Sequence, residues 1–220
     1  MKKYLLILVS AIMLCSCATQ KYTRASLYPK MYEEKPISIL IMPPINNTNH
    51  AEAKDYFYSS LSMPLTEKGY YVVSPFLASD LLKQESAYDS ELFINGSLAP
   101  FRNVFGADAV LFTTINKWEK QSGLSYIKVG IEYTLKSTKT NEVLFNRNGE
   151  LEVSFSSGSN SLLGMVIDMI ATASADKIVA ARRCNLYVLN DLPEGLYGKQ
   201  FDKDQNIKVG KQEFKGKVKK

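Results

Sequence analysis

Ile37-Ser38-Ile39-Leu40-Ile41-Met42 is a nearly continuous apolar run, and Pro43-Pro44 follows it directly. Proline has no N–H to donate to a sheet ladder, so the two prolines end the segment. A short run that is rich in β-branched residues and lacks polar alternation is typical of a strand buried on both faces. We therefore expect residues 37–42 to form a central strand of their sheet.

The segments that follow alternate between helix and strand patterns. Within residues 51–68, apolar side chains recur at helical spacing, and Pro64 inside this pattern is expected to kink or divide the helix. Residues 70–73 predict the next strand. Ser74 and Pro75 are a good N-cap and a good first helical residue, so a second helix is expected to begin there and to run through Leu77, Leu81 and Leu82. Strand, helix, strand and helix in turn indicate an α/β fold.

Further along, the strand patterns become antiparallel. Residues 109–115 predict a third buried strand, and residues 127–135 and 145–155 alternate between apolar and polar side chains around a turn at 140–142. An apolar helix is expected at residues 162–183. We therefore predict a single α/β domain whose mixed sheet has central buried strands and a long antiparallel hairpin, with helices packed on the sheet.

The first residues have the pattern of a bacterial lipoprotein signal. Two lysines, Lys2 and Lys3, precede an apolar run over residues 4–14, and the run ends in Leu14-Cys15-Ser16-Cys17. A lipoprotein signal peptidase requires an apolar residue three positions before the cut, a small residue directly before it and then a cysteine, so cleavage is expected between Ser16 and Cys17 with acyl chains such as palmitate on Cys17. The alternative is an uncleaved transmembrane anchor, but the apolar run is shorter than the roughly 20 residues that a spanning helix needs.

Two or more acyl chains would hold the mature protein on a membrane almost irreversibly. Ala18 follows the cysteine, and the absence of an aspartate there favours the outer membrane over the inner one, with the folded part in the periplasm. Residues 17–36 are polar and contain Pro29 and Pro36, which suits a linker from the lipidated cysteine. The domain itself is expected over residues 37–198.

The net charge of +5 is unevenly distributed along the 220 residues. Residues 199–220 carry eight lysines against Asp202, Asp204 and Glu213, and they show no apolar periodicity. We expect this segment to be a basic, disordered tail. A nucleic-acid partner is not expected, because no basic aromatic motif accompanies the charge.

Few residues in the chain suggest catalysis or a metal. His50 is the only histidine, which excludes a Ser-His-Asp triad and a histidine metal cluster within the chain, and neither a P-loop nor a dinucleotide-binding glycine motif occurs. Glu150 and Glu152, with Glu132 opposite, are carboxylates on the polar face of the hairpin and are expected to be solvated. We predict no cofactor and no enzymatic activity.

Two aromatic residues and one cysteine remain to be assigned. Trp118 and Tyr126, near one end of the predicted hairpin, are candidate partner contacts, although a partly buried position at the end of a strand is favoured for Trp118. Cys184 is the only cysteine outside the signal, so an intramolecular disulfide in the mature chain is excluded, and the thiol is expected to be buried.

Four motifs in order resemble a family of bacterial lipoproteins of unknown function. They are Ile39–Pro44 with Asn46-Asn47, Glu67–Val72, Gly106–Ala109, and Leu192–Gly195 with Tyr197. The resemblance implies a domain similar to the N-terminal domain of TolB. It also implies genes often placed beside a CsgG-like lipoprotein of curli secretion, and no catalytic residues. Leu196 departs from the family, which commonly has a proline there.

Two functional hypotheses follow. The first is an accessory or docking subunit of an envelope assembly or secretion complex, whose partners are other envelope lipoproteins or a CsgG-like channel component. The alternative is a periplasmic binding protein for a lipid or glycan, with the apolar helix over residues 162–175 as a pocket wall. Homo-oligomers are also conceivable through strand addition at the exposed edge of the hairpin.

Overall fold

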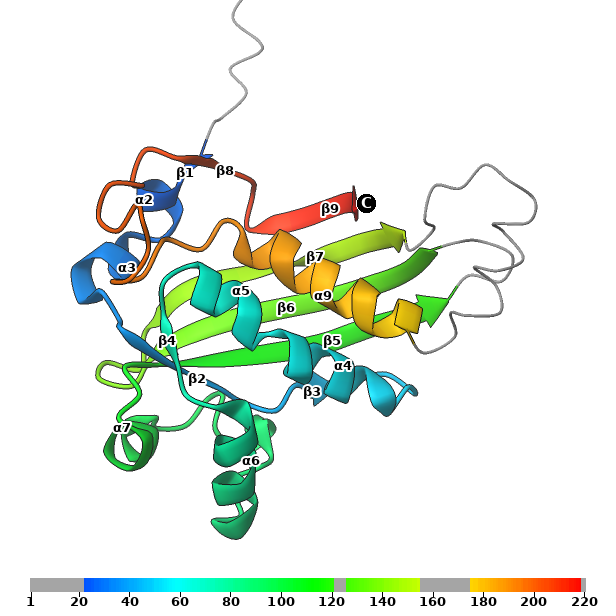
Figure 1. Ribbon diagram of the computed structural model, residues 1–220, viewed down its shortest axis with the longest axis horizontal. Coiled ribbons are helices and arrows are strands. Elements are labelled where there is room, and N and C mark those ends of the chain that lie inside the picture. The colour runs from blue at the N-terminus through cyan, green and yellow to red at the C-terminus, as the bar shows by residue number, and fades with distance from the viewer. Residues whose placement is uncertain (1–21, 121–125, 155–174, 219–220) are drawn as a thin grey trace, which may run out of the picture.

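The protein folds around a mixed β-sheet whose helices lie on both of its faces (Figure 1). A computed structural model describes residues 22–120, 126–154 and 175–218. The main sheet has the strand order β4-β2-β5-β6-β7-β9, and β3 also pairs with β5. Its strands are β2 (Ser38–Ile41), β3 (Ile45–Asn46), β4 (Tyr71–Val72), β5 (Ala109–Lys120), β6 (Tyr126–Ser137), β7 (Val143–Ser154) and β9 (Glu213–Val218).

The apolar run over residues 37–42 contains β2, as predicted. β2 lies between β4 and β5 and pairs with both in parallel, so that Ile39 is opposite Val72 on one side and Ala109 on the other. Its alternate side chains enter two separate cores. Ile39 and Ile41 belong to the larger one, whereas Leu40 and Met42 belong to the smaller one on the other face.

Helices cover the two faces to different extents. α4 (Glu52–Ser60), α5 (Ser62–Glu67) and α9 (Ala175–Leu189) pack over the larger core, and α6 (Pro75–Gln84) and α7 (Ala99–Phe105) enclose the smaller one below β2 and the start of β5. The predicted helix over residues 51–68 is indeed divided, with the break at Leu61. α9 ends six residues later than position 183, the predicted end. The predicted helical residues 162–174 lie outside the described residues.

The predicted hairpin is confirmed as β6 and β7, and β5 joins it in antiparallel pairing. β5 is longer than expected because it continues through a β-bulge between Ile115 and Lys117. Beyond the bulge the strand shifts by one residue, which reverses the faces to which its side chains point.

The expected linker over residues 17–36 is wrong for most of its length. β1 (Tyr22–Thr23), α2 (Arg24–Leu27) and α3 (Pro29–Glu34) belong to the folded domain. The side chains of Tyr28 and Met31 are only 1% and 4% exposed and lie in the larger core. Burial of these two apolar side chains stabilises the segment against the sheet.

The expected disordered tail is also wrong. We call residues 190–218 the C-terminal strap. They include β8 (Lys208–Val209), which pairs with β1, and β9, which pairs in parallel with β7 over residues 148–153. The hairpin edge that we expected to be open for strand addition is therefore occupied by the chain's own β9.

Buried ion pairs explain why a lysine-rich segment folds. Asp204 is fully buried and accepts hydrogen bonds from the Arg24 guanidinium, the Tyr32 hydroxyl at 3.0 Å and the Glu194 amide at 2.9 Å. These contacts join the strap to the N-terminal segment and provide polar partners for the buried carboxylate. The excess of lysines in the sequence does not reveal these contacts of Asp204.

The turn after α9 folds back on the domain. The amides of Gly195 and Tyr197 donate to the carbonyls of Lys68 and Gly69, and the Tyr70 hydroxyl donates to Pro193 O at 2.7 Å. Within the described part of the chain, no helix has the length and apolar character needed to span a membrane.

Candidate functional site

The predicted lipidation site lies outside the described residues. Ser16 and Cys17 are therefore still predictions at this point. The first described residue is Tyr22, in β1, five positions after Cys17. β1 and β8 lie at one end of the molecule, and α6 and α7 lie at the opposite end (Figure 1).

The partner contact predicted at Trp118 is wrong. Its side chain is 3% exposed and packs edge-to-face on Phe57, with 5.4 Å between the ring centroids. The reason is the bulge in β5, which turns Trp118 towards the larger core. Tyr126 is half-buried at the start of β6, and its role as a contact stays a prediction.

The carboxylates of the hairpin are paired with lysines on the outer face of the sheet. Glu150 is 3.5 Å from Lys117, and Glu152 accepts from Lys217 at 2.8 Å. The hydrogen bond from Lys217 lowers the pKa of Glu152. A general acid needs the opposite shift, so this cluster gives no support to acid–base catalysis.

Other candidate chemical groups in the described residues have ordinary structural environments. His50 is exposed in the loop before α4, with Nδ1 3.8 Å from Glu52. Cys184 is buried as predicted, and burial raises the pKa of its thiol to about 12, which makes it unreactive. The described part of the chain contains no group of three His, Cys, Asp or Glu side chains that could hold a metal.

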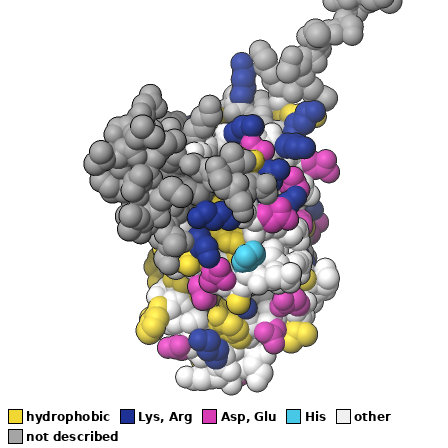
Figure 2. All heavy atoms as spheres, turned by 90° about the vertical axis from the view of Figure 1, so that its right-hand side faces the viewer, with side chains coloured by type: hydrophobic (Ala, Val, Ile, Leu, Met, Phe, Trp, Pro, Cys, Tyr) yellow, Lys and Arg dark blue, Asp and Glu magenta, His cyan; other side chains and the backbone are white. Residues whose placement is uncertain are grey.

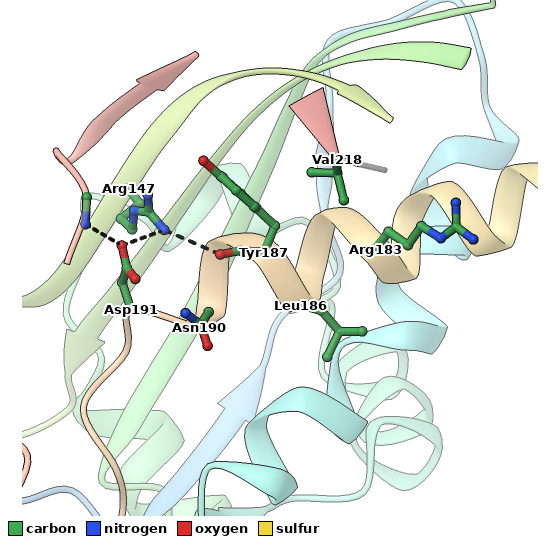
Figure 3. Close-up of a pocket in the computed structure, with 8 residues that line it drawn as sticks. Arg147, Arg183, Leu186, Tyr187, Asn190, Asp191 and Val218 are labelled. Atoms are coloured by element: carbon green, nitrogen blue, oxygen red, sulfur yellow. Dashed lines mark hydrogen bonds and ion pairs between the residues drawn. The ribbon is translucent and has the colours of Figure 1, made fainter. Parts of the chain in front are cut away.

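A hollow of about 510 Å³ lies between α9, β7 and the strap (Figure 3). Its floor is an ion pair between Arg147 and Asp191 at 3.1 Å, and the Gly210 amide donates to the same carboxylate at 3.0 Å. Arg147 also lies over the rings of Tyr187 and Phe214. The polar groups of the hollow thus hold β7, α9 and the strap together.

The hollow does not provide the apolar pocket that the binding-protein alternative requires. Its walls combine apolar side chains with the charged groups Arg147, Arg183 and Asp191. The helix proposed as its pocket wall, residues 162–175, lies almost entirely outside the described residues.

A better candidate for a contact surface is formed by α6, α7 and the short 3-10 helix η1 (Ser90–Leu92) between them. Four large apolar side chains of this segment are exposed, and we call them the lobe surface. They are Phe76 (73% exposed), Leu77 (67%), Leu92 (68%) and Val104 (59%). Apolar side chains are visible at the lower end of the molecule, which holds α6 and α7 (Figure 2).

The predicted helix runs through Leu77, Leu81 and Leu82, but only Leu82 of these three is buried. Ala78 and Leu82 fill the buried positions of α6. Two neighbouring pairs of large apolar residues, Phe76-Leu77 and Leu81-Leu82, are more than one face of a ten-residue helix can bury. This excess of apolar residues in the sequence could have indicated an exposed apolar surface on the helix.

Comparisons with known proteins agree with the fold. A family model described as "Putative lipoprotein GNA1162-like" matches residues 27–187. A curated relative from Neisseria meningitidis serogroup B, described as "Putative lipoprotein NMB1124/NMB1162", is 24% identical over 180 residues, which span 81% of this chain and 83% of the relative. Neither description names an enzymatic activity.

A solved structure has the same fold. The crystal structure of lipoprotein GNA1162 from Neisseria meningitidis superposes with a TM-score of 0.50 and 22% sequence identity, over 64% of this chain and 99% of the other. The family match ends inside α9, so the C-terminal strap lies beyond it.

Proposed function

Because this chain belongs to the GNA1162-like family of lipoproteins, we propose that it is a non-enzymatic docking subunit, anchored in the outer membrane through Cys17 with its domain in the periplasm. The observation that carries the proposal is the signal at residues 14–17 in a chain whose family is one of lipoproteins. The anchor supplies location and a high effective concentration for a partner at the same membrane.

The lobe surface is the proposed docking site. Large apolar side chains that are exposed next to one another are typical of interaction sites. Phe76 and Leu77 are adjacent on α6, and both are more than two-thirds exposed. The lobe lies at the end of the molecule opposite β1, where the chain leads to the anchor, so a membrane-bound domain would present it to the periplasm (Figure 1).

The partner is proposed to be another envelope protein. The family resemblance suggests an envelope lipoprotein or a CsgG-like channel component. An apolar docking surface requires a partner with an apolar groove or face, which is the usual composition of a buried interface core.

The proposal is tested by photo-crosslinking in cells. A photoreactive amino acid replaces Phe76 in the full chain, and a matched control carries it at Lys139, an exposed polar position in the β6–β7 turn. We expect a discrete crosslinked envelope protein from position 76 and none from position 139. The double variant Phe76→Ser, Leu77→Ser should lose co-purification of that protein while its unfolding free energy changes by about 0.5 kcal/mol or less.

Two outcomes would contradict the docking role. One is the absence of any crosslinked protein from position 76 in cells that contain the acylated chain. The other is co-purification of the same partner by the double serine variant at the wild-type level.

A further inference from the structure

The strap brings basic side chains to the end of the domain where the chain arrives from Cys17. In the β1–β8 pair, Tyr22 is opposite Val209 and Thr23 is opposite Lys208. The pairing continues with hydrogen bonds from the amides of Arg24 and Ala25 to the carbonyls of Ile207 and Gln205. Residues 205–209 therefore run alongside the first described residues.

The two aspartates that precede β8 in the strap are already neutralised. Asp204 is paired with Arg24 inside the protein, and Asp202 is paired with Lys35 at 2.6 Å. Lys203, Lys208 and Lys211 are exposed and make no ion pair with any described residue. The surface around β8 is therefore more positive than the sequence of the strap alone suggests.

An exposed apolar side chain accompanies these lysines. Ile207 is 42% exposed and directly precedes Lys208. A mixture of lysines and an exposed apolar residue is typical of surfaces that lie against membrane headgroups.

The chain length sets how far this surface can lie from the bilayer. Cys17 and Tyr22 are five residues apart, and five residues span at most about 18 Å when fully extended. Lysine side chains extend from the domain towards the bilayer. Their attraction to anionic headgroups acts over a screening length of about 8 Å at physiological salt, so direct contact with the headgroups is not required. This step rests on the proposed acylation of Cys17.

We propose that Lys203, Lys208 and Lys211 form a membrane-facing surface that binds the anionic headgroups of phospholipids. This contact would orient the domain so that the lobe surface points away from the membrane. A lysine close to an anionic membrane surface increases binding by about fivefold, so reversing two of them should lower membrane partitioning by roughly 25-fold or more.

The test uses the full acylated protein in vesicles, either of phosphatidylcholine alone or with added phosphatidylglycerol. A water-soluble amine reagent labels exposed lysines, and the labelled sites are read by mass spectrometry. We expect Lys208 and Lys211 to be labelled several-fold less in the vesicles that contain phosphatidylglycerol. About 1 M salt, which shortens the screening length to about 3 Å, should restore labelling. Lys54 in α4 and Lys83 in α6 are the internal controls, with unchanged labelling.

Charge-reversal variants separate this proposal from the docking function. In the pair Lys208→Glu, Lys211→Glu, the labelling of the remaining Lys203 should not depend on phosphatidylglycerol, whereas in the matched pair Lys54→Glu, Lys83→Glu the labelling of Lys208 and Lys211 should still depend on it. If the protein proves to carry no lipid, the same pairs are compared by co-sedimentation with these vesicles, so a failure of acylation leaves the charge proposal testable. Equal labelling in both kinds of vesicle, or protection by cell-wall sacculi instead of by phosphatidylglycerol, would overturn the assignment.

Discussion

At the scale of single residues, two buried aspartates hold the C-terminal strap on the domain. Asp204 is ion-paired with Arg24 and accepts hydrogen bonds from the Tyr32 hydroxyl and the Glu194 amide. Asp191 is ion-paired with Arg147 and accepts a hydrogen bond from the Gly210 amide. Each carboxylate is buried together with its arginine. Removing one partner of such a pair leaves an uncompensated charge in the interior.

We expect Asp204→Ala to lower the unfolding free energy by about 3–5 kcal/mol, because the Arg24 guanidinium loses its buried counter-charge. Denaturant unfolding measures the change. The matched control is Asp202→Ala, two positions earlier, whose ion pair with Lys35 is exposed and should contribute about 1 kcal/mol or less. Equal losses in the two variants would contradict this account.

Lys68 gives the protein a predictable response to alkaline pH. Burial lowers the pKa of this lysine from 10.5 to about 8, while its ammonium group donates to Asn190 O at 2.7 Å. Between about pH 8 and pH 10, the unfolded chain therefore binds more protons at this site than the folded one, so the contribution of Lys68 to stability should rise with pH. The buried thiol of Cys184 contributes in the opposite direction above about pH 9, so the effect of Lys68 is read as a difference between wild type and a variant.

The measurement is the unfolding free energy of wild type and Lys68→Met across this pH range. The stability of wild type relative to the variant should increase with pH over this range. Arg24 still donates to Asn190 O at 2.8 Å in the variant, so the carbonyl stays satisfied. Above about pH 10, stability should fall in both proteins, because burial raises the pKa of Tyr70 and Tyr133 and only the unfolded chain releases those protons. Identical pH profiles below pH 10 would contradict the role of Lys68.

At the scale of secondary-structure elements, the predictions succeeded where the pattern of apolar residues is local. β2 could be predicted because its apolar run has no polar alternation, and β6 and β7 because their alternation is regular. β9 could not, because Phe214 and Val218 are its only large apolar side chains and its position depends on the β7 edge. Trp118 was misplaced because a bulge depends on the neighbouring strands and leaves no clear mark in one sequence.

Gly149 provides a direct test of the β7–β9 pairing. A Cβ at this position would lie 1.9 Å from the carbonyl oxygen of Phe214, so a side chain cannot fit while β9 is in place. We expect Gly149→Val to release β9 and to speed amide hydrogen exchange in residues 214–218 at least tenfold, which corresponds to about 1.4 kcal/mol.

The amides of β6 are the control within the same sample, because they bond to β5 and to the other side of β7. They should keep their protection. Unchanged exchange in residues 214–218 would mean that β9 does not pair with β7 in solution.

At the scale of the whole molecule, the proposed anchor and the proposed docking surface occupy opposite ends of one domain. The lipidation site is a prediction that rests on the sequence alone, because a peptidase reads such a motif as a linear signal. The lobe surface could not be predicted, since the exposure of Phe76 and Leu77 depends on how α6 packs against β2. The basic surface around β8 could not be predicted either, because it depends on the ion pairs by which Arg24 and Lys35 neutralise the nearby aspartates.

The most direct test of the account is mass spectrometry of the protein purified from membranes. We expect the mature chain to begin at Cys17 and to carry diacylglycerol on the sulfur. Cys17→Ala should leave the signal uncleaved and the cysteine-linked lipid absent. A wild-type chain found in the envelope without lipid on Cys17, or still carrying residues 1–16, would contradict the central claim.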